Sequence, residues 1–574
     1  MKRVFLGRIQ ISSQEDIETC LRKNFKGVTN VTFLDPVEDP WQKNFLKTTK
    51  VHKQMLKYTK KLKSAKTLNL KSIDFCLEPS EAIQFAKNVS RIDRVSLKYN
   101  SRHHEQTMLQ RKAPIKDKIW LKFIRRLRGV DYNLLDTSRF SKDHKPLKTL
   151  KVMTNHQLNL KMLRIQLPSE EISPEKRFWK RLLHLKKLET LAIDGGIFDK
   201  PINSLQNDLK YIDFTFHHKS SVVFVSSAVK LTTQLFQLKT LNLTFSNDAV
   251  PTVTSDCCML SQLHQLRKVN LGFNMSSGRS QSISCYLDAL KNLPLTHFEL
   301  RCSINKDSEM APISYFIRNS KSLESLKLEI VNLGSFKGNG EFLKIANSVG
   351  RCEALKSLSL VFTTTAKKIK KTLFPKALGN EFVLNFSQLK SLENLKLECN
   401  QFDEDKDDVV LEILEALTEN TKQLKCLELE IGKYSVDNNI EFEKVLNAMN
   451  TFEKVSLLKI WSLEVQNSVQ LNGLAGCISN MKNLREFAFG NIHEGLEKMD
   501  VANGITKMLY GRNLSSLYWK NSKNFMKNYS WKEISKKEIA KINPFLKNYS
   551  TDLLRILNKQ RFYSDDDYSS EEDY

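Results

Sequence analysis

Residues 386–402 read "FSQLKSLENLKLECNQF" and combine two leucine spacings in one short stretch. Leu389, Leu392 and Leu395 are three residues apart, which suits one side of a helix. Leu395 and Leu397 are two residues apart, which suits one face of a strand. A spacing of three, three and two therefore predicts a helical side that turns directly into a short strand.

The same spacing recurs along the chain at a nearly constant interval. If the residue that corresponds to Leu395 is taken as a marker, thirteen segments carry one, on average 29.5 residues apart. The markers are Leu163, Leu191, Ile212, Leu241, Val269, Phe298, Leu326, Leu358, Leu395, Leu427, Leu458, Phe487 and Leu517. Such a period predicts a repeat array, in which each unit buries its leucines against the next unit.

Upstream of the first marker the repeat is less regular. Leu68 and Val95 are 27 residues apart, and Val31 is a weaker earlier member of the series. We assign "LKTLKV" (147–152) to a further repeat, and segment 100–146, which is rich in basic residues, to an insertion or an irregular repeat. The chain is therefore expected to hold about 15 repeats.

The segments between the markers have helical patterns. "DDVVLEILEALTEN" (407–420) places Val410, Leu414 and Leu417 on one helix face. "APISYFIRNS" (311–320) carries its proline where the first turn of a helix tolerates one. Each repeat is therefore expected to consist of one short strand and one helix.

These motifs resemble the leucine-rich repeat family, whose pattern is LxxLxLxxN/CxL. "LENLKLECNQF" (392–402) matches the whole pattern, and "LRKVNLGFN" (266–274) matches it as far as the asparagine. A strand and a helix within 28 or 29 residues are similar to the ribonuclease-inhibitor-like class. The resemblance implies an α/β solenoid shaped like a horseshoe, with a parallel concave β-sheet and convex helices, in which Asn400 bonds to the turn after its strand.

The expected organisation follows from these repeats and from the charge distribution. Residues 1–60 are read as a basic N-terminal cap or divergent first repeats, 61–520 as the solenoid, 521–562 as a C-terminal helical cap, and 563–574 as a disordered acidic tail. The last ten residues contain six acids, and Ser569 and Ser570 precede acids as acidophilic kinase sites do. Phosphorylation of these two serines is therefore an expectation.

Composition and missing motifs limit the function classes. There is no apolar run of signal-peptide or membrane-spanning length, no CxxC pair and no glycine-rich phosphate loop. We expect a non-enzymatic protein without cofactor, metal, small-molecule substrate or membrane anchor. The ten scattered cysteines indicate reduced thiols in the cytoplasm or the nucleus.

The residues between the leucines of each strand are expected to line the concave face and to bind a protein partner. They are Arg94, Lys98, Arg164, Tyr211, Asp213, Asn242, Lys268, Asn270, Glu299, Arg301, Lys327, Glu329, Lys396, Glu398, Glu428, Glu430, Lys459 and Trp461. The alternative is a nucleic-acid partner, because residues 1–150 hold 33 Lys and Arg against 15 Asp and Glu. The sequence leaves both partner classes open.

Overall fold

The computed structural model describes the chain in two compact units, unit 1 (Met1–Pro294) and unit 2 (Leu295–Tyr574). It describes residues 8–11, 30–33, 67–70, 87, 94–97, 125, 132–136, 151–152, 154–156, 160–166, 180–194, 205, 208–216, 222–246, 255–274, 280–304, 310–332, 340–364, 385, 388–399, 409–431, 434–435, 439–490, 492–493, 496, 500, 504, 507–508, 514 and 516–519. Segments 521–562 and 563–574 therefore lie outside the described residues.

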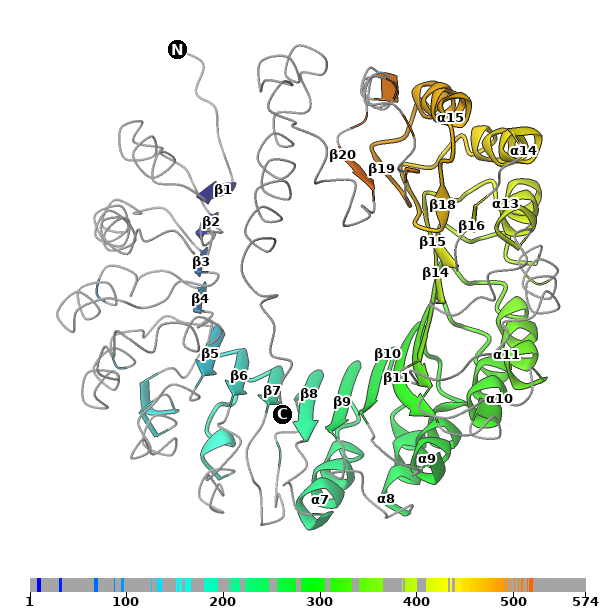
Figure 1. Ribbon diagram of the computed structural model, residues 1–574. Coiled ribbons are helices and arrows are strands. Elements are labelled where there is room, and N and C mark those ends of the chain that lie inside the picture. Colours follow the sequence, from blue (N-terminus) through cyan, green and yellow to red (C-terminus); the bar gives the residue numbers. More distant parts are fainter. Residues whose placement is uncertain are drawn as a thin grey trace, which may run out of the picture. The chain divides into compact units, whose positions relative to one another are not determined.

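Unit 1 is built from short parallel strands (Figure 1). The first sheet holds β1 (Arg8–Ile11), β2 (Asn30–Phe33), β3 (Thr67–Leu70) and β4 (Arg94–Leu97). A second run of neighbours is β5 (Tyr132–Asp136), β6 (Met162–Gln166), β7 (Thr190–Asp194), β8 (Tyr211–Phe216), β9 (Thr240–Ser246) and β10 (Lys268–Asn274). The helices of unit 1 whose bounds the structure describes are α7 (Val222–Thr232), α8 (Ser255–Cys258), the 3-10 helix η3 (Met259–Gln262) and α9 (Ser280–Leu290).

Unit 2 continues the strand and helix alternation. Its parallel strands, in spatial order, are β11 (His297–Ile304), β12 (Ser325–Asn332), β13 (Ser357–Thr364), β14 (Asn394–Cys399), β15 (Cys426–Ile431), β17 (Leu457–Ile460), β19 (Glu486–Phe489) and β20 (Ser516–Trp519). Two further strands, β16 (Tyr434–Ser435) and β18 (Leu463–Glu464), pair in parallel as a separate two-stranded sheet. The helices are α10 (Ala311–Asn319), α11 (Gly340–Gly350), α13 (Val409–Asn420), α14 (Asn439–Asn450) and α15 (Ser468–Asn480), and they line one side of these strands (Figure 1).

The leucine spacing has the structural meaning that the sequence predicts. All thirteen markers lie in strands and are buried, with at most 3% of any side chain exposed. Neighbouring markers are register partners, as Leu358, Leu395 and Leu427 are in β13, β14 and β15. The described chain is thus an α/β protein with long, open parallel sheets, compatible with a repeat solenoid.

Two of the helix predictions can be compared directly with the structure. Helix α13 covers most of the predicted 407–420 segment, and its Val410, Leu414 and Leu417 are all buried. Helix α10 begins at Ala311 with its proline in the first turn. Both predictions are confirmed.

The assignment of segment 147–152 to a repeat stays a prediction, because residues 147–150 lie outside the described residues. Lys151 and Val152 are helical, and the strand that precedes β6 is β5, Tyr132–Asp136. An LxxL spacing fits a helix as well as the turn before a strand, so the pattern alone could not separate the two.

Polar residues replace leucine at the ends of three helices in unit 2. Ser320 and Thr421 are buried, and their hydroxyls donate to Phe316 O and Leu417 O at 2.9 and 2.6 Å. Cys352 Sγ makes the same kind of contact with Ser348 O at 3.7 Å. Each side chain satisfies a helical carbonyl four residues back, so a buried polar group ends the helix without an unpaired atom.

Candidate functional site

The strands of unit 2 present alternate side chains to opposite faces. In β15 (Cys426–Ile431) every second side chain is buried, which leaves Glu428 and Glu430 partly exposed between the buried Leu427, Leu429 and Ile431. We call the exposed set the polar face of unit 2. Its charged members are Glu299, Arg301, Lys327, Glu329, Lys396, Glu398, Glu428, Glu430, Lys459 and Glu486.

Five of these residues form one ion-pair network across four neighbouring strands. Lys396 Nζ lies 3.0 Å from a Glu398 carboxylate oxygen and 3.8 Å from one of Glu428. Lys459 Nζ lies 3.1 Å from Glu428 and 3.1 Å from Glu486. Glu428 therefore stands at the centre, because it is the member that both lysines share.

The network keeps both lysines charged. Burial alone would lower the pKa of Lys396, but its hydrogen bond to Glu398 and the nearby carboxylates outweigh burial, so its pKa is raised. The pKa of Lys459 is raised in the same way, with burial opposed by hydrogen bonds to Glu428 and Glu486. Both ammonium groups consequently remain protonated at neutral pH.

Two further ion pairs extend the polar face towards the start of unit 2. Arg301 Nε lies 3.1 Å from a Glu329 oxygen, and Lys327 pairs with Glu299 in the neighbouring strand. The ten charged members of the polar face are four bases and six acids, which leaves two negative charges in excess. This surface is consequently acidic in a chain whose net charge is +26.

Two glutamates on the polar face, Glu398 and Glu430, lie opposite each other near Trp461. Glu398 and Glu430 are register partners on β14 and β15, and like charges directly opposite each other destabilise a sheet. Trp461 directly follows β17 and is partly exposed, and its backbone N–H donates to Leu429 O at 2.8 Å. Gly490 packs against this turn so closely that a Cβ would lie 2.7 Å from Trp461 O.

One polar cluster of unit 1 combines neutral and charged side chains. Asn242 Nδ2 donates to the Tyr211 hydroxyl at 2.7 Å, and that hydroxyl donates to Asp213. Burial raises the pKa of the Asp213 carboxyl, Arg164 opposes this rise, and the charge of Asp194 adds to it. The Asp213 carboxyl is therefore held by two neutral side chains and one nearby cation.

Most of the predicted surface residues lie between the buried residues of their strands. Arg164, Tyr211, Asp213, Asn242, Lys268, Asn270, Glu299, Arg301, Lys327, Glu329, Lys396, Glu398, Glu428, Glu430, Lys459 and Trp461 are all exposed or partly exposed. Arg94 begins β4, where the structure describes the backbone. Lys98, Asn400, Ser569 and Ser570 lie outside the described residues.

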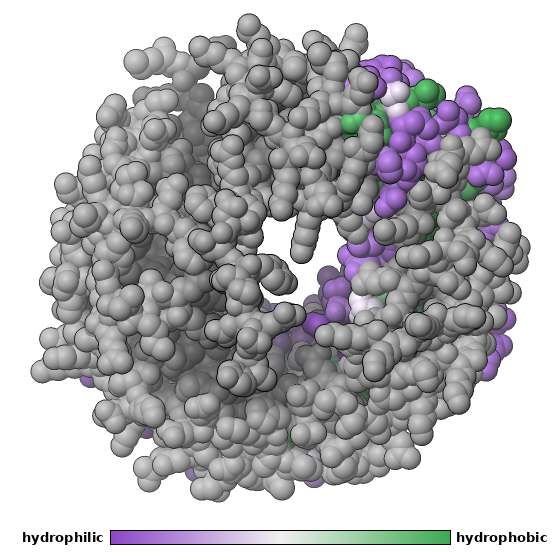
Figure 2. Space-filling view, viewed as in Figure 1, coloured by the Kyte–Doolittle hydropathy of each residue, from purple (hydrophilic) through white to green (hydrophobic). Residues whose placement is uncertain are grey.

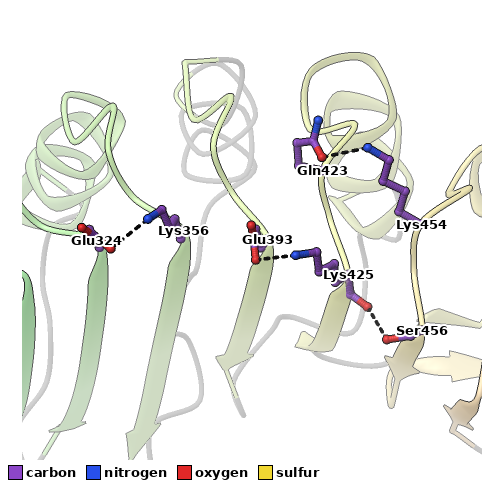
Figure 3. Close-up of polar contacts among 7 residues, drawn as sticks. All are labelled: Glu324, Lys356, Glu393, Gln423, Lys425, Lys454 and Ser456. Atoms are coloured by element: carbon purple, nitrogen blue, oxygen red, sulfur yellow. Dashed lines mark hydrogen bonds and ion pairs between the residues drawn. The ribbon is translucent and has the colours of Figure 1, made fainter.

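Sequence reasoning missed two sets of residues. Glu486 belongs to the network, and its place just before the marker Phe487 is the signal that could have found it. A row of entry residues, two positions before each marker, was also missed. In this row Lys356 Nζ bonds to Glu324 at 2.9 Å and Lys425 Nζ to Glu393 at 2.8 Å, where the chain enters the strands (Figure 3).

In the part of the chain that the structure describes, no group of three or more His, Cys, Asp and Glu is arranged to hold a metal ion. The described cysteines are free thiols, and burial raises the pKa of Cys352 to about 11 and of Cys477 to about 12. None of the described helices is long and apolar enough to span a bilayer.

The chain was compared with known protein families and with curated proteins. Neither a scan against models of protein families nor a search of curated proteins finds a match for this chain.

Proposed function

We propose that the chain is a leucine-rich repeat protein of the ribonuclease-inhibitor-like class and acts as a non-enzymatic, protein-binding scaffold in the cytoplasm or the nucleus. The family assignment is supported by thirteen markers at a regular period, each buried in a strand of a parallel sheet. Parallel register at this period is how such repeats share a core.

The polar face of unit 2 is the proposed binding surface. The observation that carries this proposal is the network centred on Glu428, which spans four strands and borders Trp461. A preformed network costs little side-chain entropy on binding, and tryptophan commonly anchors interfaces. The excess negative charge favours a partner whose contact surface is basic.

The test is affinity purification with the full chain and two altered forms. Trp461→Ala and the double change Glu428→Lys/Glu430→Lys should each reduce recovery of the wild-type partner at least tenfold, because about 1.4 kcal/mol is a factor of ten in affinity. Glu415→Lys/Glu443→Lys on α13 and α14 is the matched control, since both glutamates are exposed on helices and the charge change is equal.

Two results would contradict the proposal. Recovery of the same partner by all three variants would show that the polar face is not the binding surface. Loss of the partner with the helix control alone would move the interface to the helices. Circular dichroism of each variant shows whether a loss of binding reflects a loss of folding.

A further inference from the structure

Six turns of unit 2 form a second charged surface where the chain enters its strands. They comprise residues 320–324, 351–356, 388–393, 421–425, 451–456 and 481–485, and we call them the entry edge. Figure 3 shows part of this edge between the helices and the first residues of the strands. Near α14 and α15 the described surface shows hydrophilic residues with hydrophobic patches between them (Figure 2).

The entry edge is more basic than the chain as a whole. Its bases are Lys321, Arg351, Lys356, Lys390, Lys422, Lys425, Lys454, Lys482 and Arg485, and its acids are Glu324, Glu353, Glu393 and Glu453. Nine bases against four acids exceed the chain's own ratio of 90 to 64. The polar face of the same unit has the opposite sign, so charge is segregated between two surfaces.

Two of the acids are already paired, and several bases are not. Glu324 and Glu393 bind Lys356 and Lys425, and hydrogen bonds to these lysines lower the pKa of both carboxyls. Three exposed lysines, Lys321, Lys390 and Lys422, form no ion pair with any described carboxylate. Their charges are therefore available to an anion from outside.

Backbone hydrogen bonds hold successive turns in a regular row. Lys356 N donates to Glu324 O at 2.8 Å, Glu393 N to Lys356 O at 2.8 Å, and Lys425 N to Glu393 O at 2.7 Å. Neighbouring strands lie about 4.8 Å apart, so cationic turns recur along a line. An evenly charged, linear polyanion fits such a line better than a single compact anion does.

The residue types indicate which features of such a polyanion the entry edge would contact. Seven of the nine bases are lysine, which contacts phosphate as a point charge and carries no base preference in such contacts. Within these six turns the one aromatic residue is Phe452, which is buried, so the edge has no platform on which single-stranded bases could stack. A duplex needs no such platform, because its bases already stack on each other.

We propose that the entry edge of unit 2 binds the phosphate backbone of double-stranded nucleic acid without sequence preference. This surface is distinct from the polar face, and from the basic region 1–150 that the sequence alone suggests. It gives the chain a second ligand class beside a protein partner.

The test measures binding of the full chain to a labelled, mixed-sequence DNA duplex of about 20 base pairs over a range of salt concentrations. Lys390→Glu/Lys422→Glu alters two neighbouring turns of the edge. Lys344→Glu/Lys444→Glu, on helices α11 and α14, is the matched control with the same charge change. The edge variant should bind about tenfold more weakly and lower the salt slope by about two, one for each lysine, whereas the control should stay near wild type.

Lys390→Gln/Lys422→Gln provides a milder second variant, and equal melting temperatures show that the variants are folded. Equal binding by the edge and helix variants would overturn the proposal. Tighter binding of a single strand of the same length would overturn it too. Displacement of the duplex by polyglutamate as effectively as by unlabelled DNA would assign the edge to acidic protein segments instead.

Discussion

The polar face and the entry edge of unit 2 use the same two residue types, lysine and glutamate, with opposite results. On the polar face, the Lys459 side chain is 20% exposed and contacts two carboxylates. On the entry edge, the Lys425 side chain is 52% exposed and contacts one. The first arrangement is a partly buried acidic network, whereas the second is a solvated row with surplus positive charge.

This comparison shows that the position of a charged residue within the repeat determines how strongly it interacts with charges in neighbouring repeats. Residues between the leucines are flanked by neighbouring strands on both sides, so their charges couple across several repeats. Residues at the strand entrance face water, where an ion pair contributes at most about 1 kcal/mol. Changes at these two positions should therefore have different consequences, and a change in the shared core should abolish both surfaces.

The largest effect is expected from Leu427→Ala, which removes a fully buried side chain of β15, the strand that carries Glu428 and directly follows the entry turn 421–425. Unfolding free energy should fall by about 2 to 5 kcal/mol because a large-to-small change loses burial and leaves a cavity. Denaturant unfolding measures this fall, and Lys422→Ala is the surface control. A loss below about 1 kcal/mol would mean that β15 does not support the two surfaces.

A smaller effect is expected from Glu428→Lys, which places a third lysine between Lys396 and Lys459. Two partly buried ammonium groups lose their shared partner and gain a like charge, so stability should fall by about 1 to 2 kcal/mol. Glu428→Gln keeps hydrogen-bonding capacity and should cost less. Unchanged denaturation midpoints for both variants would show that the network is energetically unimportant.

Glu393→Lys makes the same charge reversal on the entry edge and should lower stability less than Glu428→Lys does, because the pair is exposed to solvent, which screens it. It should also tighten duplex binding, since the edge gains two positive charges. Thermal unfolding and duplex titration measure the two effects. If Glu393→Lys destabilises the protein as much as Glu428→Lys does, the claim that charges on the polar face contribute more to stability than charges on the entry edge is contradicted.

The smallest effect concerns the carboxyl of Asp213 in unit 1, whose pKa is raised above its ordinary value of 3.8. A raised folded-state pKa means that this group's contribution to stability is fully present below the ordinary pKa. That contribution is lost as pH rises through the folded pKa. Stability of wild type relative to Asp213→Asn should therefore decrease over this window, as urea unfolding at several pH values would show. An increase would contradict the assignment.

The strand pattern could be predicted because it depends on local spacing. Leu395 and its counterparts are two residues from a second apolar residue, and only a strand places both on one buried face. The register of segment 147–152 stayed open because its LxxL spacing also suits a helix, and Lys151 and Val152 are indeed helical. The burial of Thr421 at a position where other repeats have leucine could not be predicted either. It depends on a hydrogen bond from the Thr421 hydroxyl to a carbonyl of the preceding helix.

The candidate site was predictable as a set of positions but not as a network. Lys396 and Glu428 could be placed on one face from the repeat alone. Their pairing depends on the register of strands about 30 residues apart, which side-chain identity does not determine. The entry edge was missed because its charges precede the leucine pattern rather than interrupt it.

The most direct test of the two-surface account is site-specific photo-crosslinking with the full chain. A photoreactive phenylalanine derivative would replace Glu430 on the polar face or Lys390 on the entry edge, in the presence of both the purified protein partner and a DNA duplex. The account predicts protein adducts from position 430 and DNA adducts from position 390. The same ligand crosslinking equally from both positions would contradict it.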